Sequence, residues 1–557
     1  MSNIATMDDF SRSAVENFVQ TVVFVDDKIY FPSPSGTVIQ EKNITTPRTR
    51  KLSTKSAEEA ANYKTVTTPL TEESPSFSPH EIQSSFAKKQ IACSLHQPKK
   101  TDSVKIESVT YQLCACADIV IVDWDLHGDA GIKATHLIEN LVTQSLIDDP
   151  HQLRLILIYT SEPNLFDIAN TLYERLSDKV SGEIEYKDAD QGLAFHTSNA
   201  RVVVLGKPGE RLEKYKSFEV TEHGLAERAI KEYCNLADGL LQGCILHGLA
   251  AIRKQSRKIL TKFHSGLDAA FLTHRALGLP HEEAFDHISP LLVAEIEAVL
   301  EDSLPTPLIN NAVISSWCKE IWRYSDHASK FVPNGTDLLG FANKFCTKGM
   351  GIADDYASGN SSDLGKTIKG LKEQEPKWPS VNSPNFKSLT SFLSTDTSGA
   401  DLRELSAVMS QRTYYGVNRR LTLGSIIRET DGDKRFLICL QPVCDSVRLK
   451  KDSTFIFCFL EEAKGEKATF VVNDEKIFTD LIYKPGIKQN CITLKFKPTK
   501  GLVSAINLVF TDTSDSKKYQ WIAQLKPKHA QRAAEQFARE LSRIGLTESE
   551  WLRLKAK

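Results

Sequence analysis

Acidic, hydroxyl and lysine side chains follow four apolar runs in the N-terminal part of the sequence. The runs cover residues 21–25, 117–122, 153–159 and 201–205. Each run is typical of a strand that is buried on both faces of a sheet. The polar residues directly after them are, in chain order, Asp26 and Asp27, Asp123, Thr160 and Ser161, and Lys207 with Pro208. The carboxyl ends of parallel strands meet at one edge of a sheet, so we expect these side chains to converge there.

Three carboxylates at one edge predict a cation-binding site. Asp26, Asp27 and Asp123 repel one another and raise each other's pKa values unless a cation compensates. Only oxygen ligands are present, so the expected ion is Mg²⁺, which keeps several of its waters. A carboxylate beside Mg²⁺, a hydroxyl and an ammonium group is equipped to attack a phosphoryl group, because metal and lysine stabilise charge on the transferring oxygens. The predicted product is an aspartyl phosphate.

The strands that must position these residues alternate with stretches of helical periodicity. Helices are predicted at residues 8–18, 80–92, 104–116, 132–144 and 165–176, with a further short strand near 91–95. Such alternation, with strands rich in Val and Ile, is typical of a parallel sheet covered on both faces. The predicted fold class of this part is α/β, doubly wound and flavodoxin-like.

From Thr221 to Tyr324 the pattern is helical. Apolar residues recur there at steps of four and three: Ala226, Ile230, Tyr233, Ala237, Leu240 and Cys244. This seam is suited to packing on another helix, either in the core or, as the less favoured alternative, in a dimer contact.

A β-rich module with terminal helices is predicted after a Ser-, Gly- and Pro-rich linker. Its strands are expected at 421–427, 435–440, 454–460, 468–472, 491–496 and 505–510, and its helices at 529–544 and 548–554. The predicted domains are an α/β domain at 1–220 with a disordered insertion at about 31–80, an all-α region at 221–353, a linker at 354–402 and the β-rich module at 403–557.

Composition excludes several classes of protein. The chain has 557 residues and a net charge of −2, from 69 Lys and Arg against 71 Asp and Glu, so no chain-wide positive field favours nucleic acid or an acidic membrane. Eleven cysteines without zinc-site spacing are typical of a reducing compartment. The sequence has no signal-like start and no run of about 18 apolar residues, so we expect a cytoplasmic protein without a membrane span.

The residues at the strand ends resemble the active-site set of the receiver domain of two-component response regulators. The segment Asp123-Trp-Asp-Leu-His-Gly-Asp-Ala-Gly131 is similar to that family's loop after the third strand, in which glycines stand at the fifth and eighth positions after the phosphorylated Asp. Counting back from Gly128 and Gly131 selects Asp123, not Asp125, as the acceptor. The resemblance covers roughly residues 15–240.

The resemblance implies a role for each matching position. Asp26, Asp27 and Asp123 are expected to bind Mg²⁺, with Asp125 supplying a backbone carbonyl. Thr160 and Lys207 are expected to contact the phosphoryl group, which a partner sensor histidine kinase donates. Beyond receiver self-phosphorylation and dephosphorylation, no enzymatic activity is indicated.

Four features depart from the family's pattern. A long insertion follows the first strand, and extra residues at about 182–199, expected to form a hairpin, precede the last one. His127 stands where the family often has Pro. Val204 replaces the aromatic residue three positions before the lysine, which argues against the family's usual aromatic-flip mechanism.

The sequence shows no clear output module. Residues 515–557 carry ten Lys or Arg against five Asp or Glu in two helical stretches, which is a weak signal for DNA binding. Cys444 beside Asp445 has no histidine nearby in the sequence to activate it as a nucleophile. The layout resembles receiver components of Detocs-type bacterial anti-phage phosphorelays, which implies a phosphate sink or adaptor whose partners are the kinase, a second receiver or effector, or another copy of the chain.

Two alternatives remain open at the level of the sequence. In the first, the C-terminal half is an effector with an unrecognised enzymatic activity that phosphorylation switches. A pocket within residues 400–557 lined by polar side chains favours that alternative, whereas a filled apolar barrel favours the adaptor. In the second, the protein is a transcription regulator, for which duplex binding weakens steeply with salt.

Overall fold

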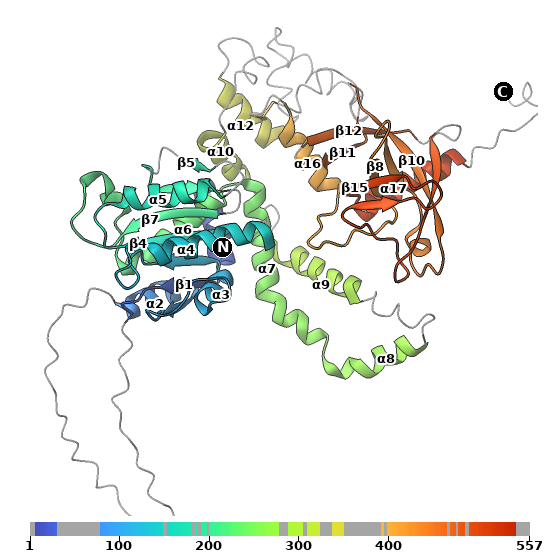
Figure 1. The fold of residues 1–557 in the computed structure, drawn as a ribbon. Coiled ribbons are helices and arrows are strands. Elements are labelled where there is room, and N and C mark those ends of the chain that lie inside the picture. Colours follow the sequence, from blue (N-terminus) through green and yellow to red (C-terminus); the bar gives the residue numbers. More distant parts are fainter. Residues whose placement is uncertain are drawn as a thin grey trace, which may run out of the picture. The chain divides into compact units, whose positions relative to one another are not determined.

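The computed structural model describes residues 6–29, 78–148, 153–179, 184–186, 191–197, 200–277, 288–304, 309–322, 337–349, 392–394, 398–464, 468–474, 477–484 and 490–541. The chain divides into two compact units, Met1–Glu320 and Ile321–Lys557 (Figure 1). The finer division into four parts stays a prediction.

The N-terminal unit is built on a seven-stranded sheet in the order β2-β1-β3-β4-β7-β6-β5. Its strands are β1 (Thr21–Val25), β2 (Ala92–His96), β3 (Ile119–Val122), β4 (Arg154–Thr160), β5 (Glu185–Tyr186), β6 (Ala194–His196) and β7 (Ala200–Gly206). The five strands β2, β1, β3, β4 and β7 are parallel, which confirms the predicted doubly wound fold. The predicted hairpin is also confirmed: β5 and β6 extend the sheet beyond β7 as antiparallel strands.

Two helical layers cover this sheet. The helices are α1 (Met7–Phe18), α2 (Pro79–Lys88), α3 (Val109–Ala115), α4 (Ile132–Asp148), α5 (Leu165–Ser177) and α6 (Leu225–Leu236). In one layer α4 contacts α3 and α5, and in the other α6 contacts α1 and α2. Every residue of β3, β4 and β7 is buried between the two layers.

Capping side chains decide where two of these helices begin. At α1, the Thr6 hydroxyl accepts a hydrogen bond from the Asp9 N–H, and the Asp9 carboxylate accepts one from the Thr6 N–H. At α3, the Ser108 hydroxyl accepts from the Tyr111 N–H. Because Ser108 caps the helix there, α3 is shorter than the predicted helix over 104–116.

The predicted helical seam belongs to two helices. The helix α6 ends at Leu236, and α7 (Leu240–Lys262) begins after Gly239. Ala226, Ile230 and Tyr233 pack in the core of the sheet domain, whereas Leu240 and Cys244 lie in a separate cluster that contains Met7, Phe10 and Val313. The core-packing interpretation is therefore correct. The unit continues with α8 (Asp268–Leu277), α9 (Ile288–Ser303) and α10 (Asn311–Glu320).

The C-terminal unit holds the β-rich module. Its strands are β8 (Ser425–Glu429), β9 (Phe436–Cys439), β10 (Ser453–Glu462), β11 (Phe470–Asp474), β12 (Ile477–Tyr483), β13 (Cys491–Phe496), β14 (Val509–Thr511) and β15 (Lys518–Gln524). They form an antiparallel sheet in the order β11-β12-β10-β9-β8-β15-β14, with β13 paired to β10. Helices α12 (Leu338–Lys348), α16 (Ala400–Ser410) and α17 (Pro527–Leu541) complete the unit.

The β-rich module is confirmed, with corrections at particular elements. Strands β12 and β15 were not predicted, and α16 begins inside the predicted linker. The strand expected at 505–510 is shorter, because Asn507 and Leu508 have positive φ values and form a turn before β14.

Both faces of this sheet are buried in apolar clusters. Neighbouring residues of one strand belong to different clusters: Ile426 faces a cluster that includes Ala530 and Ala533 of α17, and Ile427 faces a second cluster that includes Phe455. The Tyr483 hydroxyl donates to the Ala533 carbonyl at 2.9 Å and ties α17 to the first face.

Most of three predicted segments lies outside the described residues. Of the linker predicted at 354–402, only residues 392–394 and 398–402 are described. Of the insertion predicted at 31–80, only residues 78–80 are described, and Ser78 caps α2. The final helix predicted at 548–554 lies wholly outside. Among the helices that are described, none is both long and apolar enough to cross a membrane.

Candidate functional site

The strand order brings two acidic residues side by side. β1 lies between β2 and β3 in the sheet, so the strand order changes direction at β1. The backbone pairing continues one residue beyond each strand: the Asp123 N–H donates to the Val25 carbonyl at 2.8 Å, and the Asp26 N–H donates to the His96 carbonyl at 3.2 Å. Asp26 and Asp123 therefore leave neighbouring strand ends at the edge where ligands of such sheets bind.

Lys207 joins both acids from the end of β7. Its Nζ donates to Asp26 Oδ2 at 2.9 Å and to Asp123 Oδ1 at 3.0 Å. Asp26 is 0% exposed and Asp123 2% exposed, so these are buried ion pairs. Charge-assisted hydrogen bonds of this kind are among the strongest in proteins, and they fix the ammonium group between the carboxylates.

Asp27 completes the acidic cluster with an oxygen that has no partner. Its Oδ2 accepts a hydrogen bond from the His127 N–H at 2.9 Å and lies 3.3 Å from the His127 ring. Its Oδ1 is buried without a hydrogen-bond partner. Ligand oxygens of Asp26, Asp27 and Asp123 all lie within 4.8 Å of one another. A buried carboxylate oxygen without a partner is costly and fits a group that takes a cation.

Burial and neighbouring charges shift the pKa values in this cluster. Burial raises the pKa of Asp123 to about 6, with Lys207 opposing the shift and Asp26 adding to it. Burial alone would lower the pKa of Lys207, but Asp123 and Asp26 outweigh it and raise that pKa above its ordinary value. Lys207 therefore stays an ammonium group, and Asp123 is a carboxylate at neutral pH.

The loop after Asp123 needs its glycines for two different reasons. His127, Gly128, Ala130 and Gly131 all have positive φ values. At Gly128 (φ +73°) an added Cβ would meet open space, so only the backbone conformation requires glycine. At Gly131 (φ +86°) an added Cβ would also lie 2.1 Å from the Trp124 ring. The second glycine thus lets the start of α4 approach the loop.

Thr160 ends β4 opposite Gly206, the residue before Lys207. Its side chain is buried, and its Oγ1 accepts a hydrogen bond from the Glu162 N–H at 3.1 Å. The Lys207 N–H donates to the Thr160 carbonyl at 2.7 Å. The backbone pairing of β4 and β7 therefore holds the hydroxyl and the ammonium residue at the same edge of the sheet.

Arg211, which sequence reasoning missed, ties this edge together. Its guanidinium donates to the carbonyls of Thr160 at 2.9 Å, Lys207 at 2.7 Å and Glu162 at 2.6 Å. The side chain is 1% exposed, and burial lowers its pKa from the ordinary value. No spacing in the sequence indicates this role, because the hydrogen bonds that Arg211 donates to this edge all go to backbone carbonyls.

Val204 and Tyr159 occupy the interior next to the site. Val204 is buried within β7, so no aromatic ring stands at that position. The nearby ring is Tyr159, whose centre lies 5.5 Å from Lys207 Nζ and whose hydroxyl donates to the Val220 carbonyl at 2.8 Å.

This geometry agrees with a comparison against known families. Residues 18–212 match the family model of the response receiver domain. The match covers the sheet with its acidic cluster and leaves the C-terminal unit outside. No curated protein and no solved structure matches the chain.

Within the receiver domain, the structure brings together Asp26, Asp27, Asp123 and Lys207, with Thr160 at the same sheet edge. The Asp125 side chain is used differently, since its Oδ1 accepts a hydrogen bond from the Ala130 N–H at 3.0 Å. Its carboxylate thus stabilises the loop, and the expectation that its backbone carbonyl binds a metal stays a prediction.

Proposed function

We propose that the receiver domain accepts a phosphoryl group on Asp123 from a partner sensor histidine kinase. The observation that carries the proposal is that the Lys207 ammonium group makes two buried ion pairs, one with Asp26 and one with Asp123. Beside them lies an Asp27 oxygen that has no hydrogen-bond partner. A solvated cluster of acids on a turn has neither feature. The family match over residues 18–212 supports the same reading.

The donor set fits Mg²⁺. Asp26, Asp27 and Asp123 offer only oxygen atoms, and the free Asp27 Oδ1 needs a positive partner. Together with the Asp125 backbone carbonyl they would hold the ion, which when bound neutralises charge on the oxygens of the group in transfer.

The residues of the chain have separate roles in the transfer. An Asp123 carboxylate oxygen forms a bond to phosphorus while the bond from phosphorus to the kinase histidine nitrogen breaks, and the histidine keeps the electron pair. Lys207 and the Thr160 hydroxyl contact the phosphoryl oxygens. The products are an acyl phosphate on Asp123 and a free histidine on the kinase.

The remainder of the chain is proposed to make protein contacts, so that the protein serves as a phosphate sink or adaptor in a bacterial phosphorelay. A second receiver, an effector or another copy of the chain is the expected contact. The link to anti-phage defence rests only on the resemblance in layout to Detocs-type components; no comparison adds to it.

Phosphotransfer tests the proposal directly. Wild type and Asp123→Asn are incubated with a small phosphodonor such as acetyl phosphate, or with a phosphorylated kinase encoded nearby, in the presence of Mg²⁺. Wild type should gain an acid-stable, hydroxylamine-sensitive label that Asp123→Asn lacks. Labelling that persists in Asp123→Asn would remove Asp123 from this role.

One observation bears on the effector alternative. The interior of the β-rich module is apolar, but a cavity with polar lining opens beside α17. Its described lining contains no Cys, His or Asp, so it offers neither a Ser-His-Asp nor a Cys-His arrangement. Its presence favours the effector alternative over a filled apolar barrel, and its lining suits the binding of a ligand.

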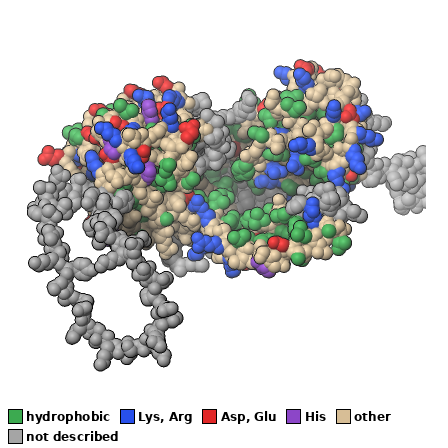
Figure 2. Space-filling view, turned by 60° about the horizontal axis from the view of Figure 1, so that its bottom comes forward, with side chains coloured by type: hydrophobic (Ala, Val, Ile, Leu, Met, Phe, Trp, Pro, Cys, Tyr) green, Lys and Arg blue, Asp and Glu red, His purple; other side chains and the backbone are tan. Residues whose placement is uncertain are grey.

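The transcription-regulator alternative gains little support. On the face shown in Figure 2, the Lys and Arg side chains of the described residues in each unit are interspersed with acidic and apolar ones rather than joined in a continuous stripe. A duplex-binding surface needs such a stripe.

A further inference from the structure

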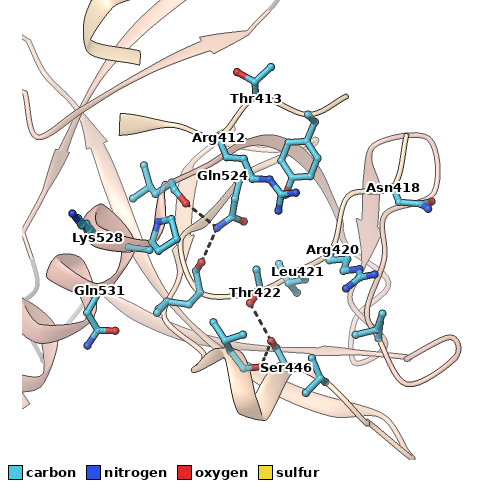
Figure 3. Close-up of a pocket in the computed structure, with 18 of the residues that line it drawn as sticks. Arg412, Thr413, Asn418, Arg420, Leu421, Thr422, Ser446, Gln524, Lys528 and Gln531 are labelled. Carbon is cyan, nitrogen blue, oxygen red and sulfur yellow. Dashed lines mark hydrogen bonds between the residues drawn. The ribbon is translucent and has the colours of Figure 1, made fainter. Parts of the chain in front are cut away.

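A cavity of about 1100 Å³ opens in the C-terminal unit between the segment from Arg412 to Leu423, the turn at Ser446 and Val447, and the first half of α17 (Figure 3). We propose that this cavity binds a nucleotide. Its volume lies just above the range for small-molecule sites, roughly 300–1,000 Å³. The proposal does not depend on phosphorylation of Asp123.

The cavity gathers positive charge. Arg412 and Arg420 line it from the loop, and Lys528 and Arg532 line it from α17, whereas Glu535 is the one acidic residue in its described lining. Four positive charges against one negative charge leave an excess of three. Such a field attracts anions, and guanidinium groups in particular match the geometry of phosphate.

The four basic residues of the cavity differ from three arginines elsewhere in the same module, which form ion pairs with carboxylates. Arg403 pairs with Asp480, Arg428 with Asp474 and Arg435 with Glu429, each at 2.7–2.9 Å. Among the described residues, no carboxylate pairs with the four basic side chains that line the cavity. The module therefore neutralises arginines elsewhere and leaves charge uncompensated at this cavity.

The same loop offers aromatic surface beside the charge. The centre of the Tyr414 ring lies 4.8 Å from the guanidinium group of Arg412 and 4.3 Å from that of Arg419, and the ring packs edge-on against Trp521. Tyr415 and Val417 also line the cavity, and both are 89% exposed. An exposed tyrosine next to arginines suits a ligand with a flat ring and a phosphate, because bases stack on aromatic side chains.

The floor of the cavity is held in one arrangement by its own hydrogen bonds. The Gln524 side chain donates to the Leu423 carbonyl at 2.7 Å (Figure 3). It also accepts from the Ser425 hydroxyl, likewise at 2.7 Å. Nearby, the hydroxyls of Thr422 and Ser446 lie 3.1 Å apart. The base of the cavity is thus formed before a ligand arrives, which lowers the cost of binding.

A small nucleotide fits better than a nucleic-acid strand. A strand needs a groove along which positive charge tracks the backbone. Here the four basic residues line one cavity, together with apolar residues such as Leu421 and Leu525. The shape therefore accommodates one base with its phosphates rather than a run of nucleotides.

Calorimetric titration of the full chain tests the proposal. ATP, AMP, pyrophosphate and a short single-stranded oligothymidylate are titrated in buffer with EDTA, so that no metal at the receiver domain contributes. We expect ATP to bind wild type, and Arg420→Gln/Arg532→Gln to weaken ATP binding at least about tenfold. We expect Tyr415→Ala to weaken ATP and AMP but not pyrophosphate. Asp123→Asn should bind as wild type does.

The matched control is Lys450→Gln/Lys451→Gln, which removes two exposed charges of the same module outside the cavity. It should bind ATP like wild type. Three results would overturn the proposal: no binding of ATP or AMP up to millimolar concentration, equal weakening in the control, or affinity for the oligothymidylate that exceeds that for ATP and grows with strand length.

Discussion

The guanidinium carbon of Arg211 lies 2.4 Å from the point at which a Cβ atom at Gly206 would stand. Three backbone carbonyls hold that guanidinium, so it cannot swing away without losing buried hydrogen bonds. We therefore expect Gly206→Ala to destabilise the receiver domain by about 2 kcal/mol, within the range for buried donors left unsatisfied, and to slow phosphoryl transfer. Urea denaturation and acetyl phosphate labelling measure the two effects.

Gly209→Ala is the control for this substitution. A Cβ there would have the Lys207 carbonyl oxygen as its nearest neighbour, at 3.9 Å, so no rearrangement is required. Stability of Gly206→Ala equal to that of Gly209→Ala would show that Arg211 does not organise the edge.

Substitutions of Asp27 and Asp125 distinguish a carboxylate that binds the metal from one that stabilises the loop. Mg²⁺ at 100 times its dissociation constant should stabilise wild type by about 2.7 kcal/mol. Asp27→Asn should lose most of that gain. Asp125→Asn should keep it, because an amide oxygen can still accept from the Ala130 N–H. Urea denaturation with Mg²⁺ and with EDTA makes the comparison, and loss of the gain in Asp125→Asn would assign a ligand role to that carboxylate.

The two glycines of the acceptor loop should differ in their sensitivity to substitution. Gly128→Ala introduces only backbone strain, about 1–2 kcal/mol, since its surroundings are open. Gly131→Ala adds a clash with Trp124 and should cost more, or prevent folding. Denaturation of both variants measures the difference, and an equal cost would mean that the Trp124 ring moves freely.

A buried ion pair should make the stability of the N-terminal unit depend on acid pH. Glu232 accepts from Arg201 at 2.7 and 2.9 Å and from Arg228 at 2.7 Å. Burial opposes ionisation of Glu232, but the two arginines outweigh it and lower its pKa. A lowered pKa contributes stability that is present above the ordinary Glu pKa of about 4.3 and is lost as the pH falls through the folded value.

Glu232→Gln tests this dependence. At pH 7 it should destabilise the unit by about 3–5 kcal/mol, because it leaves the buried Arg201 without its counter-charge. The gap to wild type should narrow as the pH is lowered below about 4. Urea denaturation across that range measures the gap, and a constant gap would exclude ionisation of Glu232 as the cause.

The site residues that follow strands were predictable because a parallel sheet places the residues after its strands at one edge. Asp26, Asp123 and Lys207 each follow an uninterrupted apolar run, and such runs carry their next residue to one edge. No comparable rule covers Arg211 or the contact of His127 with Asp27. Their contacts involve loop backbone, and loop geometry leaves no periodic trace in the sequence.

Errors in the predicted elements have equally local causes. The seam through Ala226 and Cys244 keeps its spacing across a break, although Gly239 marks the break in the sequence. Strands β12 and β15 were missed because polar residues such as Asp480 and Gln520 interrupt their apolar pattern.

The double-sided burial of β8 and β9 has a consequence for how the C-terminal module melts. Each of its two apolar clusters exists only while the shared strands are in place, so neither can come apart while the other stays intact. Heating should therefore produce a single cooperative transition. A destabilising substitution on either face of these strands should lower the melting temperature of the whole module.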